Sequence, residues 1–171
     1  MKTLIIGANG FTGRRILQHL SLCGGYELTG CSLHKDIQPE SNTRFVQADI
    51  NDHPAIGRLI GEMRPDVVIN ASALSVPDYC ESHHEEAHAA NVLAVENMAR
   101  CCEQEGSRFI HLSTDFVFDG KNRSLYIEED IPAPVNYYGL SKYQGELAVA
   151  ANCSNYANVR CLLYTSDAAD D

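Results

Sequence analysis

The sequence has 171 residues, which is enough for one domain of ordinary size and too short for two full ones. Hydrophobic residues make up 44% and charged residues 21%, a globular composition that argues against disorder. The formal net charge is −10 and the basic residues do not cluster, which argues against nucleic-acid or anionic-membrane binding. No stretch approaches the ~20 apolar residues of a membrane span, and the N-terminal apolar run is too short for a signal peptide. We therefore expect a cytoplasmic domain with neither a membrane nor a nucleic acid as partner.

Strand and helix patterns alternate from the first residue. In chain order, we expect a strand over 2–6, a helix over 11–23, strands over 26–33 and 43–47, a helix over 54–63 capped by Asp52, a strand over 65–70, one long helix within 77–104, a strand over 108–112, mostly loop over 113–135, a helix over 137–151 and a strand over 159–164. This alternation implies right-handed βαβ crossovers. The predicted fold class is therefore α/β, a Rossmann doubly wound parallel sheet with helices on both faces.

The alternating strand and helix pattern also predicts where the domain begins and ends. The Rossmann domain is predicted to occupy residues 1–160. Residues 161–171 end in an acidic, Ala-rich stretch that does not continue the α/β pattern, so we expect a truncated or non-native tail. The seven cysteines are an odd number with no CxxC pair, so we expect small buried hydrophobic residues and an exposed thiol or two. Neither disulfides nor a thiolate metal site are predicted.

A glycine-rich segment lies between the first strand and the first helix. The spacing is GxxGxxG, and a pyrophosphate site needs a tight turn, close backbone approach and close helix–strand packing, each of which favours a residue without Cβ. The following helix N-terminus offers unsatisfied N–H groups and partial positive charge. The segment predicts a dinucleotide site whose cofactor-binding residues are Gly7, Asn9, Gly10, Phe11, Thr12 and Gly13.

The end of the second strand bears on which dinucleotide binds. It carries no carboxylate before Asp36, and an acidic residue there would bind both ribose hydroxyls of NAD. Ser32, with Arg14 and Lys35 as nearby cations, would tolerate a 2′-phosphate instead. NADP(H) is therefore favoured and NAD(H) is the alternative. A second alternative is that Arg14 and Lys35 are only solvated surface charges.

Two further segments complete the expected cofactor site. Asp49, with Ile50 beside it, follows the third strand and is placed to accept a hydrogen bond from an adenine amino group; a turn or helix cap is the alternative role. The fourth strand ends in small residues that let the backbone lie against a flat cofactor, with tight strand–helix packing as the alternative. These residues are Ala71, Ser72 and Ala73.

A YxxxK pattern supplies the expected catalytic pair, Tyr138 and Lys142, both of which are also expected to bind the cofactor. Positions i and i+4 share a helix face, so the ammonium is expected near the phenol, where it would favour the phenolate over a free-Tyr pKa of ~10. Thr114 ends the fifth strand, and open α/β sheets bind ligands at the carboxyl ends of their strands. Thr114 would hydrogen-bond a substrate carbonyl oxygen and Tyr138 would protonate it as hydride reaches the carbon, with Ser113 as a backup hydroxyl.

The chain resembles the extended short-chain dehydrogenase/reductase superfamily and, within it, the dTDP-4-dehydrorhamnose reductases. The resemblance runs to about Arg160 and rests on residues 7–13, 64–73, Asn91, the STDxVFDG segment at 113–120 and the sequence 134–146, which contains YGxSKxxGE. It implies a Rossmann fold, a Thr–Tyr–Lys catalytic set and NAD(P)H-dependent reduction of the 4-keto group of a dTDP-sugar substrate, giving dTDP-L-rhamnose for cell-surface polysaccharide. It also implies that Lys142 holds the nicotinamide ribose hydroxyls.

Such reductases continue for roughly another hundred residues or more, consistent with a further substrate-binding portion. We therefore expect this chain to lack most of that portion, to bind cofactor at best and to turn over poorly. A homodimer is expected only of the full-length protein. Phe116 stands where many reductases carry Tyr and where the sister dehydratases need Glu, which argues against dehydratase chemistry.

Three other functions compete with the reductase. A sugar-nucleotide epimerase is opposed by the missing acidic residue after the second strand, and a non-catalytic NAD(P)-binding regulatory protein by the intact Thr114, Tyr138 and Lys142. The segment His84–His88 matches the HExxH zinc-protease pattern, but no third ligand is evident and the family has a solvated acidic helix there, so no metal is predicted. Asn91 either supports the active site or makes a structural hydrogen bond.

Overall fold

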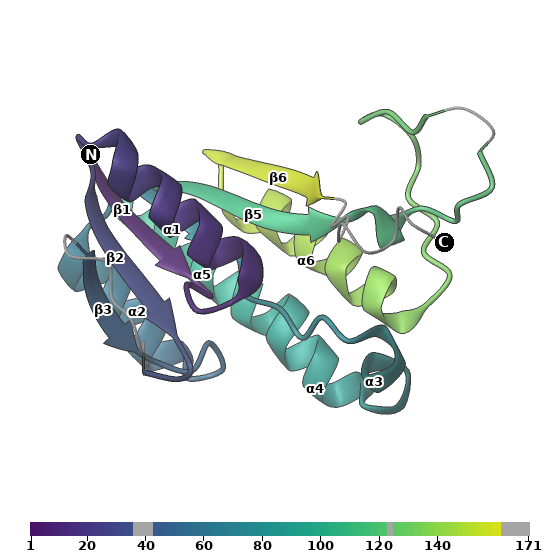
Figure 1. Cartoon of the computed structure of the whole chain (residues 1–171). Helices are drawn as coiled ribbons and strands as arrows, with labels where there is room; N and C mark the ends of the chain where they lie inside the picture. The colour runs from purple at the N-terminus through teal and green to yellow at the C-terminus, as the bar shows by residue number, and fades with distance from the viewer. Residues whose placement is uncertain (36–42, 123–124, 162–171) are drawn as a thin grey trace.

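The computed structural model describes residues 1–35, 43–122 and 125–161. Six parallel strands form one sheet in the order β3-β2-β1-β4-β5-β6 (Figure 1). The strands are β1 (Lys2–Ile6), β2 (Glu27–Ser32), β3 (Thr43–Gln47), β4 (Val67–Asn70), β5 (Arg108–Thr114) and β6 (Tyr156–Cys161). This order reverses between β1 and β4, which is the Rossmann arrangement, so the predicted fold class is confirmed.

The helices connect successive strands. They are α1 (Phe11–Cys23), α2 (His53–Met63), α3 (Pro77–Ser82), α4 (His84–His88), α5 (Ala94–Glu105) and α6 (Tyr137–Asn152), with a π-helical turn at Ala89–Leu93 and a 3₁₀ turn at Asp115–Val117. As predicted, Asp52 caps α2: its carboxylate accepts a hydrogen bond from the Ala55 N–H at 3.0 Å. Among the described residues, no helix combines the length and apolar character that crossing a membrane requires.

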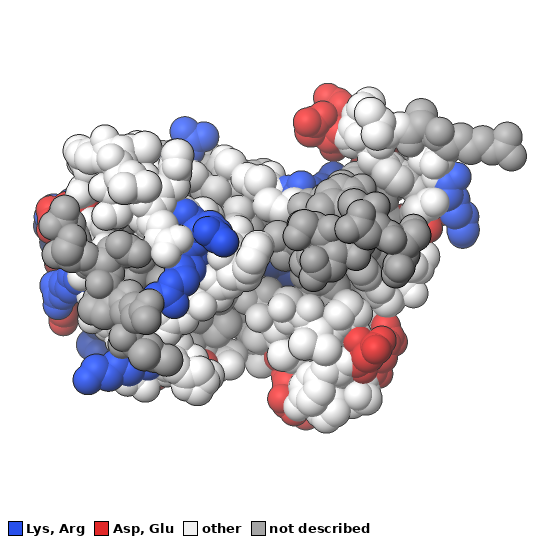
Figure 2. All heavy atoms as spheres, in the orientation of Figure 1, with Lys and Arg blue, Asp and Glu red and all other residues white. Residues whose placement is uncertain are grey.

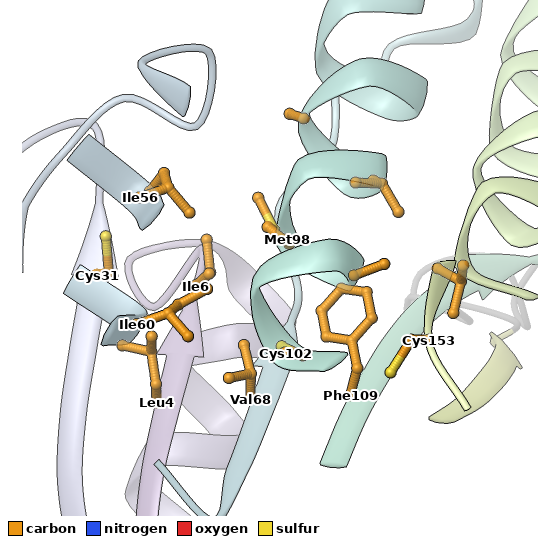
Figure 3. Packing of buried hydrophobic residues seen from close by; sticks show 14 residues of the cluster. Leu4, Ile6, Cys31, Ile56, Ile60, Val68, Met98, Cys102, Phe109 and Cys153 are labelled. Carbon is orange, nitrogen blue, oxygen red and sulfur yellow. The ribbon is translucent and has the colours of Figure 1, made fainter. Parts of the chain in front are cut away.

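The main core fills the space between the sheet and the helices α2, α5 and α6 (Figure 3). Strand residues such as Leu4, Val68 and Phe109 meet helix residues such as Ile60 and Met98, all of them fully buried. Cys31, Cys102 and Cys153 belong to this cluster, Cys80 is buried outside it, and Cys23 is exposed, as the sequence led us to expect. A smaller cluster joins Ile5 and Ala8 to Leu17 of α1 on the other face, so helices cover both sides of the sheet.

The region 77–104, predicted to contain one long helix, holds it only from His84 onward: α4, the π-helical turn and α5 follow one another without a gap to Glu105, and α3 is a separate short helix before them. Helix α3 ends at Ser82, because His83 has a φ of −130° and a ψ of 58°, which are not helical. The Tyr79 carbonyl accepts hydrogen bonds from the Ser82 hydroxyl at 3.2 Å and contacts the His83 ring nitrogen at 3.0 Å, so side chains replace the backbone bond that would continue α3. A π-helical turn then offsets α4 from α5, and such turns are frequent at functional sites.

The last strand also differs from the prediction. β6 begins at Tyr156 rather than at residue 159, because its pairing with β5 fixes the register from Phe109↔Tyr156 to Thr114↔Cys161. Hydrophobicity alone missed the polar start of an edge strand. The predicted strand residues 162–164, like Asp36 and the tail after Cys161, lie outside the described residues.

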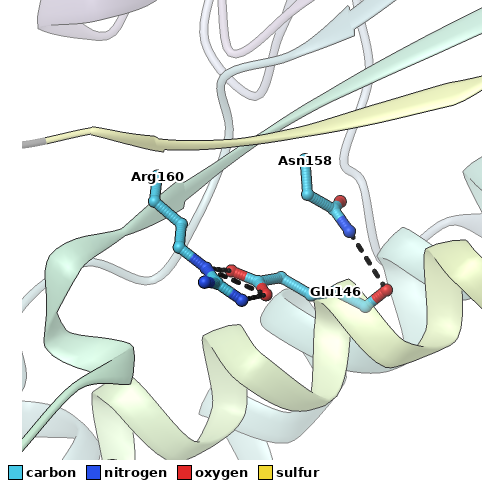
Figure 4. A network of polar contacts seen from close by, with 3 residues as sticks. All are labelled: Glu146, Asn158 and Arg160. Atoms are coloured by element: carbon cyan, nitrogen blue, oxygen red, sulfur yellow. Dashed lines mark hydrogen bonds and ion pairs between the residues drawn. The ribbon is translucent and has the colours of Figure 1, made fainter. Parts of the chain in front are cut away.

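A buried ion pair ties β6 to α6 (Figure 4). The Arg160 guanidinium donates to both oxygens of Glu146, with its Nη2 at 2.7 Å from Oε2 and its Nε at 3.0 Å from Oε1. The Glu146 side chain is 5% exposed and the Arg160 side chain 24%. The pair brings the last described strand onto the helix that carries Tyr138 and Lys142.

We expect Glu146→Ala to lower the free energy of unfolding by about 2 kcal/mol, because it leaves the partly buried Arg160 guanidinium without its carboxylate partner. Urea denaturation measures the change. Glu96→Ala is the matched control, since Glu96 pairs with Arg100 on the surface of one helix and its removal costs about 0.5 kcal/mol or less. Equal losses in the two variants would contradict a structural role for the Glu146–Arg160 pair.

Candidate functional site

A cleft of about 820 Å³ opens at the carboxyl ends of the strands, where the strand order reverses. This volume lies within the range of small-molecule and cofactor sites. The predicted site residues that line it are Gly7, Asn9, Gly10, Phe11, Thr12, Ser32, Asp49, Ile50, Ala71, Ser72, Ala73, Thr114, Tyr138 and Lys142. Residues from both ends of the chain therefore share one cavity.

Two of the three glycines in the loop, Gly7 and Gly13, have no room for a Cβ atom. Gly7 has a positive φ of 82°, and a Cβ there would lie 2.6 Å from the Ser72 nitrogen. A Cβ on Gly13 would lie 2.2 Å from the Gly7 carbonyl oxygen, so Gly13 packs beneath the loop instead of lining the cleft. Gly10 precedes α1 and offers no side-chain cap, so the helix N-terminus remains directed at the cleft. This cradle fits the pyrophosphate of a dinucleotide.

The end of β2 is tied to the glycine loop. The Asn9 N–H donates to the Ser32 hydroxyl at 2.9 Å, and the Asn9 side-chain amide donates to the His34 carbonyl at 2.8 Å. Asp49 lines the cleft and accepts a hydrogen bond from the Asn51 N–H at 2.9 Å, so it does form the turn given as its alternative role. Lys35 is exposed at the end of this segment.

Charge is unevenly distributed over the face in Figure 2. Most of the visible Lys and Arg side chains lie over the side of α1, β2 and β3, whereas Asp and Glu gather mainly over α3 and α4 and on the protruding segment at the upper right. The acidic residues in the first turns of those two helices are Asp78, Glu85 and Glu86. The positive charge therefore lies on the side of the glycine loop, which favours an anionic ligand there.

The expected catalytic residues meet at the other end of the cleft. Thr114, 6% exposed, ends β5; its hydroxyl donates to the Asp115 carboxylate at 3.1 Å and is close enough to Tyr138 to influence the pKa of that phenol. The Tyr138 ring packs edge-on against Phe116, with the ring centres 5.6 Å apart. Lys142 is 2% exposed, and its Nζ donates to the Leu112 carbonyl at 2.7 Å. Asn136 caps α6 by accepting from the Gly139 N–H at 2.7 Å, which fixes the helix that carries the pair.

The electrostatics of the pair differ from the prediction. Burial raises the pKa of Tyr138, a hydrogen bond from Thr114 opposes this, and the charges of Cys80, Asp115 and Cys161 add to it. The expectation that Lys142 lowers the Tyr138 pKa is therefore wrong, because the ammonium is held against the Leu112 carbonyl. Burial in turn lowers the pKa of Lys142 from 10.5 to about 8. Tyr138 is consequently a protonated acid at neutral pH, which suits a proton donor.

Two further polar residues lie beside this group: His111, which sequence reasoning missed, and Ser113, which it named only as a backup hydroxyl. His111, fully buried in β5, lies with its Nε2 3.4 Å from Lys142 Nζ. The Ser113 hydroxyl is buried at the cleft and has no hydrogen-bond partner within the described part of the chain. A buried hydroxyl without a partner is costly, and a polar ligand in the cleft would supply one. The signal for His111 is a histidine in the middle of an otherwise buried strand pattern.

Asn91 makes the structural hydrogen bonds given as one of its alternatives. Its side-chain oxygen accepts from the Leu74 N–H at 2.9 Å, and its amide donates to the Leu74 carbonyl and to the Ser141 hydroxyl, each at 3.0 Å. The Ser141 hydroxyl in turn donates to the Tyr138 carbonyl at 2.8 Å. Asn91 thus joins the segment after β4 to the first turn of α6.

The HExxH segment forms the short helix α4. The His84 ring stacks on Tyr137, with the ring centres 3.7 Å apart, instead of pairing with His88 around an ion. Across the residues that the structure describes, no three His, Cys, Asp or Glu side chains are grouped to hold a metal.

Comparisons with known proteins agree on a family. The family model described as RmlD substrate binding domain matches residues 1–169. A dTDP-4-dehydrorhamnose reductase of Burkholderia thailandensis is 36% identical over 160 residues, which are 94% of this chain and 49% of that protein. The methionine adenosyltransferase 2 subunit beta of Rattus norvegicus is 35% identical over 88% of this chain and 43% of its own length.

Solved structures agree with the sequence matches. The dTDP-4-dehydrorhamnose reductase of Bacillus anthracis, crystallised with NADP, superimposes with a TM-score of 0.78 at 28% identity, over 93% of this chain and 52% of that one. The chain thus spans about half the length of the proteins it matches. Because the family match extends over nearly the whole sequence, the chain belongs to the RmlD substrate binding domain family.

Proposed function

We propose that this chain is the nucleotide-binding part of an NAD(P)H-dependent reductase that converts the 4-keto group of a dTDP-sugar to an alcohol, dTDP-4-dehydro-L-rhamnose being the substrate. The observation that carries the proposal is the convergence of the glycine cradle with Thr114, Tyr138 and Lys142 on one cleft. The reductases of Burkholderia and Bacillus support the reaction class. A cytoplasmic location and a homodimer of the complete protein are further parts of the proposal, and they rest on the sequence.

The residues of the cleft divide the work between cofactor and substrate. The glycine loop and the α1 N-terminus would bind the pyrophosphate, Ala71, Ser72 and Ala73 would allow the flat cofactor to lie against the backbone, and Ser32 would tolerate a 2′-phosphate. When bound, the reduced nicotinamide supplies hydride to the carbonyl carbon. Thr114 donates a hydrogen bond to the carbonyl oxygen and Tyr138 gives that oxygen its proton, so an alcohol forms. Lys142 holds the nicotinamide ribose hydroxyls.

The cofactor part of the proposal is tested by titrating this chain with NADPH and NADH and following the nucleotide fluorescence. We expect NADPH to bind more tightly. Gly13→Ala is expected to weaken NADPH binding about tenfold or more, because its Cβ would displace the Gly7 carbonyl and with it the loop.

The control for this experiment is Gly57→Ala. Its Cβ would lie 3.6 Å from the Cys101 sulfur, an ordinary contact, and alanine favours the α2 helix. We expect this variant to bind NADPH as the unchanged chain does. NADH binding at least tenfold tighter than NADPH would contradict the NADP(H) preference, and the absence of binding of either would contradict the proposed function.

A non-catalytic binding role is the second candidate. The similarity to methionine adenosyltransferase 2 subunit beta favours it, since that relative is named as a subunit of another enzyme. The two candidates differ in one measurement. Because this chain is expected to turn over poorly by itself, the measurement uses the full-length protein: NADPH binding with no NADPH oxidation in the presence of the dTDP-4-keto sugar would favour the binding role.

A further inference from the structure

A line of buried polar groups runs beneath the cleft from β4 to α6. Asn70 and His111 are neighbours in the register of β4 and β5, and both are fully inaccessible to solvent. The Asn70 side chain contacts Ser72 at one end and the His111 Nδ1 at the other, the latter at 3.1 Å. Lys142 reaches the opposite nitrogen of the same imidazole from α6. The proposed catalytic mechanism uses neither Asn70 nor His111.

The contacts of Asn70 fix which nitrogen of His111 carries the proton. A backbone N–H can only donate, so the atom that lies 3.0 Å from the Ser72 nitrogen must be the Asn70 oxygen. The Ser72 hydroxyl donates to the same oxygen at 2.6 Å. The Asn70 amide nitrogen therefore faces His111 and donates to Nδ1. Burial and the charge of Lys142 lower the pKa of His111 well below its usual range, so the ring is neutral and its proton is on Nε2.

The Nε2–H group faces the Lys142 amine. Nε2 and Nζ are 3.4 Å apart, and an ammonium has no lone pair with which to accept a hydrogen bond. An uncharged amine has one and can still donate to the Leu112 carbonyl. Glu146 on α6 and Cys161 on β6 favour the charged form, although Glu146 is already paired with Arg160. The imidazole therefore opposes the charge that these groups favour.

The packing of α6 makes this contact close. A Cβ on Gly145 would lie 2.4 Å from the Asn91 carbonyl oxygen and 3.5 Å from His111 Nε2. The glycine lets the helix approach β5 until Lys142 is fully enclosed. Water is thereby kept from the amine, and the few polar atoms around Nζ decide its protonation.

We infer that His111 is a positioning residue for Lys142: Asn70 locks its imidazole as the Nε2–H tautomer, and the N–H then holds Nζ against the Leu112 carbonyl and favours the uncharged amine. The inference rests on the proposed function for its purpose. In the reductase, the Lys142 ammonium, whose pKa is lowered to about 8, would give a proton to the Tyr138 phenolate left after the substrate is protonated, and the uncharged amine so formed is the state that His111 stabilises. Ser72, Asn70 and His111 are thus one unit that sets the state of the lysine.

The first test is nuclear magnetic resonance of this 171-residue chain labelled with ¹⁵N-histidine and ¹³C-lysine, without nucleotide or sugar. We expect His111, assigned through its backbone, to be the Nε2–H tautomer and not to titrate across neutral pH. The Lys142 Cε signal is expected to titrate near pH 8. An Nδ1–H tautomer, or an imidazolium that titrates in the ordinary histidine range, would overturn the inference without any substitution.

Two substitutions distinguish the effect of the His111 N–H on the Lys142 titration from the effect of packing alone. His111→Asn keeps an acceptor for Asn70 and deletes the group that faces Lys142, so the Lys142 titration should move up by about half a pH unit or more. His111→Gln restores an N–H near the Nε2 position and should return the titration toward its original value. A cavity effect alone would raise the titration in both variants, and this result would overturn the inference.

The exposed His19 on α1 provides the matched control, since His19→Asn should leave the Lys142 titration unchanged. These measurements need no cofactor. Failure of NADPH to bind would therefore leave the tautomer result standing, and a wrong tautomer would leave the proposed reductase function intact.

Discussion

Replacing Lys142 by methionine should make the chain more stable at pH 7 and less able to bind NADPH. The side chain is 2% exposed, and its pKa falls from 10.5 to about 8 because burial disfavours the ammonium. At 1.36 kcal/mol per pKa unit, this depression corresponds to about 3 kcal/mol of destabilisation at neutral pH. Methionine fills the same space without the charge. Because the hydrogen bond to Leu112 is lost, we expect a net gain of about 1–3 kcal/mol.

The pH dependence of the free energy of unfolding tests separately whether buried Lys142 destabilises the fold. Between pH 8 and 10.5 the unfolded chain binds more protons than the folded one at this lysine, so the contribution of Lys142 to stability improves as pH rises through that window. The advantage of Lys142→Met in urea denaturation should therefore shrink from pH 7 to pH 10. Lys121→Met is the control, since the Lys121 side chain is 80% exposed and its loss should change little. A Lys142→Met variant less stable than the original at pH 7 would contradict the burial cost.

A buried lysine that costs stability is typical of a functional position. The chain surrounds it with groups that only partly compensate: the Leu112 carbonyl accepts from it, and Glu146 adds negative charge but is already paired with Arg160. A simple packing role would be better served by an apolar residue. The retention of the amine at the end of the cleft is therefore an argument for chemistry, independent of the family match.

The fold could be predicted because its signals are local and repeated. The central strands β1 and β4 are short apolar runs, and several helix ends carry glycine, proline or a capping side chain, as at Asp52 and Gly106. The break at His83 could not be predicted in this way, because it depends on side-chain contacts to the Tyr79 carbonyl. The start of β6 depends on pairing with β5 and not on its own hydrophobicity.

The candidate site likewise has features that the sequence predicts and features that depend on contacts between elements. The glycine loop, Thr114, Tyr138 and Lys142 are recognisable because their spacing is constrained within a single element, and the topology then brings them to one edge of the sheet. The direction of the Tyr138 pKa shift is not recognisable from spacing, because it depends on burial and on where the ammonium is held. His111 belongs to this second group, since its importance lies in contacts with Asn70 from another strand and Lys142 from a helix.

Tyr138→Phe should lower the rate of NADPH oxidation by a factor of about 10²–10⁴, the range contributed by a positioned general acid. The measurement uses this chain in excess over dTDP-4-dehydro-L-rhamnose, so that a single slow turnover is visible. Phenylalanine keeps the edge-on contact with Phe116 and loses only the phenolic hydroxyl. NADPH affinity should therefore change little, and the loss should fall on the chemical step. Because burial raises the pKa of Tyr138, the acid form persists well above neutral pH, and titration of this phenol should not limit the rate there.

Tyr137→Phe is the natural control, because it removes the same atom one residue earlier on α6. The Tyr137 ring stacks on His84, away from the cleft residues, and a phenyl ring keeps that stacking. We expect it to oxidise NADPH at the unchanged rate. If Tyr138→Phe and Tyr137→Phe are equally active, the phenol is not the proton donor, and Thr114 or water must protonate the carbonyl oxygen. If both variants lose NADPH binding, the N-terminal turn of α6 supports the cofactor site instead of the proton transfer. Only selective loss at Tyr138, with binding intact, agrees with a phenol that gives its proton to the substrate.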